Sequence, residues 1–155
     1  MVIRALKTAD IHELCAIERE CFADVWSEAA VLSELENGRS IMLGAFENGH
    51  LAAYLFASFV LDECSVNRIA VLPSCRRSGI AAALLGSLDR EDFSFVTLEV
   101  RRSNLPAISL YKKCGFEKVG ERRGFYVNPS EDAFIMTKQL IKSDAKLKTE
   151  GMGNA

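Results

Sequence analysis

The segment around Gly79 combines residue types that could bind phosphate. An apolar stretch ends at Pro73, and the loop that follows carries two arginines, a glycine and small residues, in the order Arg76-Arg77-Ser78-Gly79-Ile80-Ala81-Ala82. The first turn of a helix offers unpaired backbone N–H groups at the positive end of the helix dipole, and arginines add charge-assisted hydrogen bonds. The pattern is neither GxxxxGK[ST] nor GxGxxG. Taken alone, it favours a solvated basic loop.

A carboxylate and a phenol stand out in the second half of the sequence. Glu99 ends a predicted strand, and Tyr111 lies two turns into the helix that comes next. Both types of side chain can transfer protons. Crevices of α/β sheets form outside the carboxyl ends of strands, so Glu99 could face the same crevice as the loop at Gly79. Considered singly, Glu99 fits a surface carboxylate and Tyr111 a half-buried core aromatic.

Composition narrows the class of protein. The chain has 155 residues, 49% of them hydrophobic, and a net charge of -2, which fits one globular domain and gives no support for a nucleic-acid partner. Its five cysteines include no CxxC pair and it has two histidines, so we expect reduced thiols and no metal. Without a long apolar run or a signal-peptide pattern, we expect a cytoplasmic protein and no membrane partner.

Hydrophobic periodicity and turn residues predict elements in the order β-α-α-β-β-β-α-β-α-β-β. The clearest turn is Asn48-Gly49, which indicates a β-hairpin. Thr8 and Asp10 are candidate caps of the first helix, and Ser27 of the second. The first helix is expected to bury Ile11, Leu14, Ala16 and Ile17. The predicted strands cover residues 2–6, 41–46, 51–60, 65–72, 95–100, 116–121 and 134–139, and the last two helices cover 79–88 and 106–114.

This order predicts an α/β protein, α+β in some schemes. The hairpin implies antiparallel pairing and the late helices imply crossovers, so we expect a mixed, mostly antiparallel central sheet with helices on both faces. One domain is predicted over residues 1–140. Residues 141–155 form a polar, lysine-containing tail, for which disorder is expected.

The two chemical segments together resemble the GCN5-related N-acetyltransferases (GNAT). The family's pyrophosphate motif, [QR]-x-x-G-x-[GA] after a strand reading roughly I-A-V-x-P, corresponds here to Arg76-x-x-Gly79-x-Ala81 after Ile69-Ala70-Val71-x-Pro73. Residues 98–116 match LEVRxSNxxAxxLYxxxGF, a pattern most specific for the bacterial ribosomal-protein-alanine N-acetyltransferases (the RimI group).

Further matches extend the resemblance to about residues 3–140. Phe22-x-x-x-Trp26-Ser27 resembles an early aromatic–Trp–Ser signature, and Arg123-Gly-Phe125-Tyr126 with Glu131-Asp132-Ala133-x-x-Met136 resembles the R-x-Y-Y…E-D-A-x-x-M ending. The chain departs from the family at Val25, where proline is usual, at Phe125, where tyrosine is usual, and at Ala81, where glycine is commoner. Val25 and Phe125 fall where the family holds the acceptor, so they bear on the acceptor and not on the reaction.

The resemblance implies the GNAT fold and an acetyl-CoA-dependent N-acetyltransferase that transfers the acetyl group directly in a ternary complex. Glu99 would be the base and Tyr111 the acid, while a backbone N–H near Val71 would polarise the thioester carbonyl. Trp26 and Tyr126 are candidate walls of the acceptor groove, although core packing explains each equally well. The coenzyme would be held by Ile69, Ala70, Val71, Arg76, Arg77, Ser78, Gly79, Ile80, Ala81, Ala82 and Asn104.

The expected acceptor is the N-terminal α-amine of a protein, and the RimI group implies the N-terminal alanine of a ribosomal protein. An α-amine has a reference pKa of about 7.7–8.0, against about 10.4 for lysine, so a weak base suffices. Two alternatives stay open: acetylation of a small amine such as a polyamine or amino sugar, and a non-catalytic acyl-CoA-binding module. An acetyl-cysteine route through Cys75 is a rival mechanism. The sequence leaves the oligomeric state open.

Overall fold

The computed structural model describes residues 1–90 and 92–140, and the predicted tail lies outside the described residues. The chain is organised as two compact units. The first unit comprises Met1–Phe59 and Val66–Ser87, and the second comprises Val60–Ser65 and the chain from Leu88 onward. The single domain expected for residues 1–140 stays a prediction.

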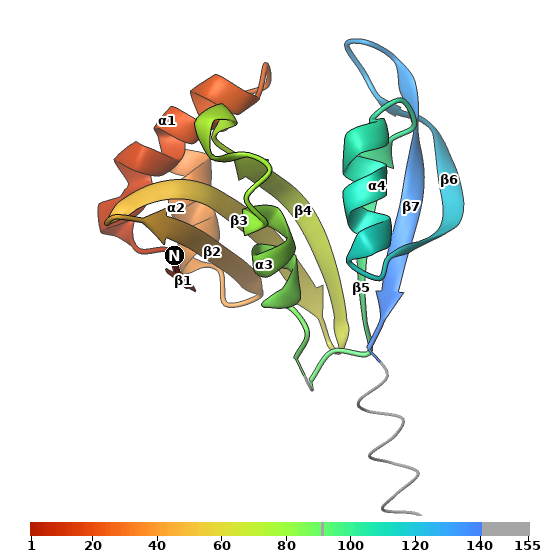
Figure 1. The fold of residues 1–155 in the computed structure, drawn as a ribbon, viewed down its shortest axis with the longest axis horizontal. Helices are drawn as coiled ribbons and strands as arrows, with labels where there is room; N and C mark the ends of the chain where they lie inside the picture. The colour runs from red at the N-terminus through yellow and green to blue at the C-terminus, as the bar shows by residue number, and fades with distance from the viewer. Residues whose placement is uncertain (91, 141–155) are drawn as a thin grey trace, which may run out of the picture. The chain divides into compact units, whose positions relative to one another are not determined.

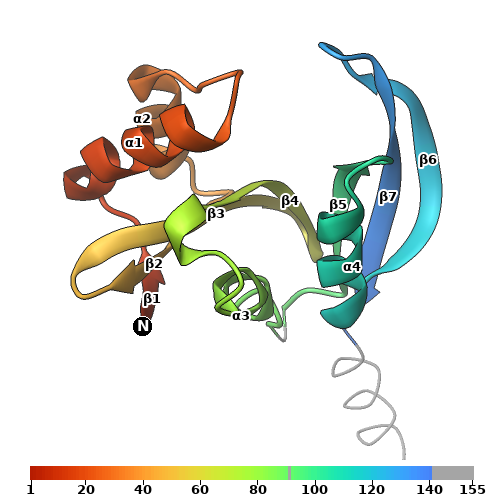
Figure 2. The same cartoon turned by 45° about the horizontal axis from the view of Figure 1, so that its top comes forward.

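The first unit is a sheet with helices on both faces. Its elements are β1 (Val2–Ala5), α1 (Ile11–Cys21), α2 (Glu28–Glu36), β2 (Ser40–Glu47), β3 (His50–Val60), β4 (Glu63–Val71) and α3 (Ile80–Gly86), of which β3 ends and β4 starts in the second unit. Helices α1 and α2 lie on one face of the sheet and α3 lies on the other (Figures 1 and 2). This layering agrees with the architecture expected from the sequence.

The core of the first unit lies between α1, α2 and the sheet. Leu14 and Ile17 are three residues apart, so both point from α1 to the same side. There they are buried with Val31 of α2 and Tyr54 of β3. Burying an aliphatic side chain of this size stabilises the fold by roughly 1.5–3 kcal/mol relative to leaving it exposed. This core supports both the helix α1 and the strands behind it.

Two features of α1 differ from the prediction. Ala16 is exposed, and the buried position next to Ile17 is taken by Glu18. Asp10 does not cap α1 with its side chain; its carboxylate accepts hydrogen bonds from the Arg4 guanidinium at 2.8 and 2.9 Å and from a backbone N–H at 2.8 Å. The carboxylate thus makes charge-assisted hydrogen bonds away from the first turn of α1.

The predicted turn and the second cap are confirmed. Asn48 and Gly49 have φ values of 51° and 80° and join β2 to β3, which pair antiparallel. The Ser27 hydroxyl accepts the Ala30 N–H at 3.1 Å and so begins α2. Asn37 follows the last residue of α2.

The second unit is built from one crossover helix and a hairpin. Its elements are β5 (Phe95–Arg101), α4 (Leu105–Lys113), β6 (Glu117–Tyr126) and β7 (Glu131–Gln139). Strand β7 lies between β5 and β6 and pairs antiparallel with both. The helix packs on one face of these strands (Figure 1). Its core contains Val96, Leu98, Val100, Ile108, Tyr111, Phe116, Ala133 and Met136.

In the part of the chain that the structure describes, the strand order is β1-β2-β3-β4 in the first unit and β5-β7-β6 in the second. The element order agrees with the prediction, although α3 ends at Gly86 rather than at residue 88 and β6 runs five residues further than expected, to Tyr126 rather than residue 121. Among the described residues, no helix combines the length and apolar character needed to cross a membrane.

Candidate active site

The predicted phosphate loop folds as a strand, a tight turn and a helix of the first unit. Strand β4 ends at Val71, a 3-10 turn covers Pro73–Cys75, and α3 begins at Ile80. Gly79 precedes the helix with φ of 81°, in the left-handed region that glycine adopts without strain. A Cβ placed on Gly79 would meet no heavy atom within 4 Å. The requirement for glycine is therefore conformational, and the turn leaves open space in front of the helix.

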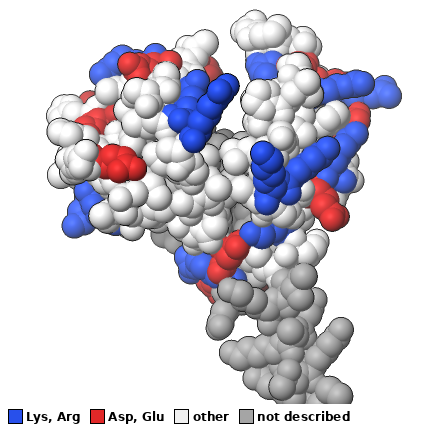
Figure 3. Space-filling model, viewed as in Figure 1, with Lys and Arg blue, Asp and Glu red and all other residues white. Residues whose placement is uncertain are grey.

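Arg76 and Arg77 take different roles in this loop. Arg76 Nε donates to the Val71 carbonyl at 3.0 Å, and its Nη2 lies 3.8 Å from the Cys21 sulfur. Arg77 is exposed with φ of 63°. Figure 3 shows Lys and Arg side chains over this part of the first unit. Arg76 thus ties the loop back to the end of β4, whereas Arg77 presents its charge to solvent.

The Ser78 hydroxyl stabilises the loop itself. Its Oγ donates to the Cys75 carbonyl at 2.6 Å, so the hydroxyl proton is already used. A phosphate would therefore meet the Ser78 backbone N–H and not the hydroxyl.

The first turn of α3 offers further backbone donors. The first i to i−4 hydrogen bond of α3 runs from the Ala83 N–H to the Gly79 carbonyl at 3.0 Å. The three residues before Ala83 have no intrahelical acceptor for their N–H groups. These three donors belong to Ile80, Ala81 and Ala82. Together with the Arg77 charge, these donors fit the diphosphate of a coenzyme.

The last residues of β4 lie directly before the loop and are packed into the first unit. Ala70 is buried, and Ile69 and Val71 are half-buried. The N–H of Leu72, the next residue, donates to the Ala52 carbonyl of β3 at 2.9 Å. Strand β4 is therefore held against β3 up to the point where the loop begins.

Glu99 has a cationic neighbour in the second unit. Its side chain on β5 is 28% exposed, and its Oε1 lies 3.4 Å from Nε of Arg122. The strand register explains this contact: Glu99 is opposite Ile135 of β7, and Arg122 of β6 is opposite Ala133, two residues away. Residue spacing alone does not indicate Arg122, because its proximity depends on the pairing of three strands.

Tyr111 is a buried phenol on α4. Its ring packs against Phe116 with 6.0 Å between centroids. Burial, together with nearby Tyr126 and Cys114, raises the pKa of Tyr111 to about 12. The phenol therefore keeps its proton throughout the neutral range.

Tyr126 lies at the end of β6, half-buried, with the Arg101 guanidinium 4.3 Å from its ring centroid. Burial and then the charge of Glu99 raise the pKa of Tyr126. Tyr126 in turn affects the pKa of Tyr111. Tyr126 thus lies within electrostatic range of the two other residues predicted from the sequence, the Glu99 carboxylate and the Tyr111 phenol.

Asn104 and Glu131 organise the turn between β5 and α4. Asn104 Oδ1 accepts the Ala107 N–H at 3.3 Å and caps the helix. A bond from the Asn104 side chain to a coenzyme would therefore have to come from Nδ2. Glu131 accepts the Ser103 N–H at 2.7 Å and lies 3.3 Å from Arg101 Nη1. Ser103, the residue before Asn104, is held by this carboxylate.

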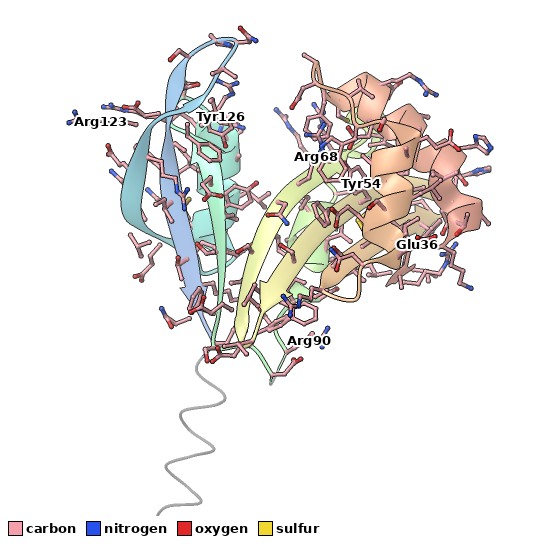
Figure 4. All side chains as sticks on the ribbon, turned by 180° about the vertical axis from the view of Figure 1, so that it is seen from behind. Glu36, Tyr54, Arg68, Arg90, Arg123 and Tyr126 are labelled. Carbon is pink, nitrogen blue, oxygen red and sulfur yellow. The ribbon has the colours of Figure 1, made fainter. Side chains whose placement is uncertain are left out.

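Trp26 packs at the edge of the first unit's core. Its half-buried ring meets Phe56 edge-on, with 5.0 Å between centroids. Close to it lies a buried ion pair, Glu18 with Arg68, whose nitrogen and oxygen atoms are 2.7 Å apart. Figure 4 shows Arg68 next to Tyr54, on the side of the sheet that α1 and α2 cover. No spacing rule links these residues, so the pair could not be found in the sequence.

Comparison with known proteins agrees with these features. The model of the acetyltransferase (GNAT) family matches residues 11–116. The [ribosomal protein bS18]-alanine N-acetyltransferase of Escherichia coli (strain K12) is 36% identical over 140 residues, which cover 86% of this chain and 94% of that protein. The protein of the same name from Haemophilus influenzae is 32% identical over 146 residues, 90% of this chain and 99% of that protein.

Comparison of the fold with solved structures also indicates this family. The crystal structure of the ribosomal-protein-S18-alanine N-acetyltransferase from Escherichia coli superposes with a TM-score of 0.82 and 34% identity, over 90% of this chain and 93% of that one. The chain thus belongs to the GNAT family and is an acetyl-CoA-dependent N-acetyltransferase.

Proposed function

We propose that this enzyme acetylates the N-terminal α-amine of a protein, and that its acceptor is the N-terminal alanine of ribosomal protein bS18. The likeness to the bS18-alanine N-acetyltransferases of Escherichia coli and Haemophilus influenzae supports this acceptor, since it extends over most of both chains. A cytoplasmic location, where ribosomal proteins are made, belongs to the same proposal.

The coenzyme is assigned to the first unit's loop and to Asn104. The diphosphate is bound by the backbone donors of Ser78, Gly79, Ile80, Ala81 and Ala82 and by the charges of Arg76 and Arg77. The pantetheine arm pairs with Ile69, Ala70 and Val71 and accepts from Asn104 Nδ2. The left-handed Gly79 and the open space around it support this assignment.

The proton transfers are assigned to the second unit. Glu99 takes the proton that the amine loses, directly or through a water, and Tyr111 gives its proton to the departing thiolate. The observation that carries the proposal is that Tyr126 interacts both with Glu99, a partly exposed carboxylate, and with Tyr111, a phenol whose raised pKa keeps it protonated. Tyr126 and Trp26 form walls of the groove that binds the acceptor.

Peptide acetylation tests the acceptor. The purified enzyme is incubated with acetyl-CoA and a peptide with the first residues of bS18, and mass spectrometry locates the added 42 Da (about one acetyl group in place of a proton). Acetylation at the α-amine is expected, and the same peptide with a blocked N-terminus should gain nothing. Faster turnover of a polyamine or amino sugar than of the peptide would replace this proposal by the small-amine alternative.

A further inference from the structure

The Arg68 guanidinium contacts several parts of the first unit at once. Its Nε and Nη2 donate to the Glu18 carboxylate at 2.9 and 2.7 Å, and Nη2 also donates to the Asp24 carbonyl at 2.8 Å. Its carbon Cζ lies 3.6 Å from the centroid of the Phe22 ring and 5.1 Å from that of Trp26. The planar fork of arginine can make these contacts together, and a lysine ammonium cannot.

Glu18 is the partner that holds this arginine in place. Its side chain is fully buried and accepts from the Tyr54 hydroxyl and, at 3.5 Å, from the Trp26 backbone N–H. Burial and the bond to Glu18 raise the pKa of Tyr54, so the phenol stays a donor to the carboxylate. Desolvation often cancels the attraction of a buried ion pair, so stability alone does not explain this one.

The contacts converge on the segment 22–27 between α1 and α2. This segment contains no helix or strand, and its two ends, at Phe22 and Ser27, share backbone hydrogen bonds with the flanking helices. Its conformation is specified at the Asp24 carbonyl, the Trp26 N–H and the Phe22 ring, each of which touches Glu18 or Arg68. The Trp26 ring then rests on Phe56 of β3. The ion pair therefore fixes the position of Trp26 through its contacts with this segment.

We infer that the Arg68–Glu18 pair is a positioning device for the acceptor: it holds the segment 22–27 in the conformation in which Trp26 contacts the peptide. This inference rests on the proposed function, because it takes Trp26 as an acceptor contact. Arg68 and Glu18 take no part in proton transfer or coenzyme binding. Their loss weakens acceptor binding and leaves the chemical step and the affinity for acetyl-CoA unchanged.

Two variants and a matched control test the inference. Arg68→Lys keeps the charge but loses the fork, and Glu18→Gln keeps the shape but loses the charge. Arg4→Lys is the control, because Arg4 makes the same kind of two-bonded pair with buried Asp10, also over an aromatic ring, 3.9 Å from the Phe46 centroid. It lies in the same unit and contacts another part of the chain.

Kinetics with the bS18 peptide is the first readout. Arg68→Lys and Glu18→Gln are each expected to raise the KM for the peptide about tenfold, the effect of losing one hydrogen bond to a charged group. The kcat and the KM for acetyl-CoA should stay within about twofold of the wild type. The variants lose acceptor binding that is equally strong in the ground state and the transition state, so the barrier of the chemical step is unchanged. Arg4→Lys should leave all three constants unchanged.

Trp26 fluorescence is the second readout, and it needs no turnover. Trp26 is the only tryptophan of the chain, so emission reports on this segment alone. Arg68→Lys should shift the emission to longer wavelength and increase acrylamide quenching, whereas Arg4→Lys should do neither. Circular dichroism and thermal unfolding establish that each variant is folded. Phe22→Leu, which removes only the ring against Arg68, replaces any variant that fails to fold and should change both readouts in the same direction.

The outcomes separate the two proposals. If the wild type acetylates the peptide and the folded variants have its peptide KM, the positioning role is wrong and the proposed function stands. Equal losses in Arg4→Lys would also overturn it, since they would indicate general loosening. If the wild type acetylates no peptide, the proposed function fails and takes the acceptor role with it, even where the fluorescence changes as expected.

Discussion

The phenol of Tyr111 keeps its proton at neutral pH, because burial raises its pKa to about 12. A thiol has a reference pKa of about 8.5, so the departing thiolate is the weaker base, and it can take this proton only in direct contact, as its bond to the acyl carbon breaks. Tyr111→Phe keeps the ring and its packing on Phe116 but removes the proton. We expect kcat to fall about a hundredfold with little change in either KM, measured by steady-state thiol release.

The neighbouring thiol provides the control for Tyr111. Cys114 lies on the next turn and contributes to the raised pKa of Tyr111. Cys114→Ala should leave kcat nearly unchanged, because the thiol does not donate the proton. Full activity of folded Tyr111→Phe would show that the acid is another group or a water.

The ion pair between Glu99 and Arg122 predicts that these two residues act together. A carboxylate that must take a proton is also oriented by the guanidinium 3.4 Å away. Arg122→Gln should lower kcat/KM by roughly three- to tenfold in the wild type and have no further effect once Glu99→Gln is present. Arg123→Gln, the exposed neighbouring residue, is the control. Additive losses in this double-mutant cycle would mean that Arg122 acts independently of Glu99.

At the scale of elements, the junction of β4 and α3 makes a prediction that separates backbone strain from coenzyme binding. Gly79 and Gly49 have φ values of 81° and 80°, lie in the same unit, and each has no heavy atom within 4 Å of a built Cβ. Gly79→Ala and Gly49→Ala should therefore destabilise the fold equally, by about 1–2 kcal/mol in urea unfolding.

Only one of these two glycines borders the assigned coenzyme loop. Gly79→Ala should raise the KM for acetyl-CoA severalfold, because the strained turn shifts the N–H groups of α3, and Gly49→Ala should leave it unchanged. An unchanged KM in Gly79→Ala, with the expected loss of stability, would exclude a coenzyme role for this turn.

Elements were predictable where local signals agree. The turn Asn48-Gly49 and the cap Ser27 act over two or three residues, and both were found in the sequence. The interior of α1 was predicted less well, because the hydrophobic pattern favoured Ala16 over the charged Glu18 for a buried position. Glu18 is buried only because Arg68 and Tyr54, far along the chain, satisfy its carboxylate.

At the scale of the whole molecule, the candidate site also contains some residues that the sequence predicts and others that it does not. The residue types and motif spacing indicated Glu99, Tyr111 and the loop at Gly79, because each is read along one segment. Arg122 lies near the site because of the strand register, and Arg68 because α1 packs on the sheet. Sequence periodicity gives the face of a strand but not its partner's register, so neither arginine had a local signal.

The chain as a whole should lose stability steeply in alkali. All three tyrosines have a pKa raised by burial in the folded state, and the buried Cys64 thiol has its pKa raised to about 11. Below about pH 10 the tyrosines are protonated in both states and contribute no difference. Above that pH the unfolded chain releases phenolic protons that the folded chain keeps, so the unfolded state binds fewer protons and the free energy of unfolding falls as pH rises.

Absorbance at 295 nm, which detects tyrosinate, measures this directly. In concentrated urea the tyrosines should titrate near pH 10. In the folded enzyme the signal should appear later and together with loss of circular dichroism, because Tyr54 and Tyr111 can ionise only when the chain opens. The urea midpoint should fall between about pH 10 and 12, and less so in Tyr111→Phe, which removes one of the retained protons. A gradual titration near pH 10 with the fold intact would mean that water reaches these phenols, and the predicted loss of stability in alkali would be wrong.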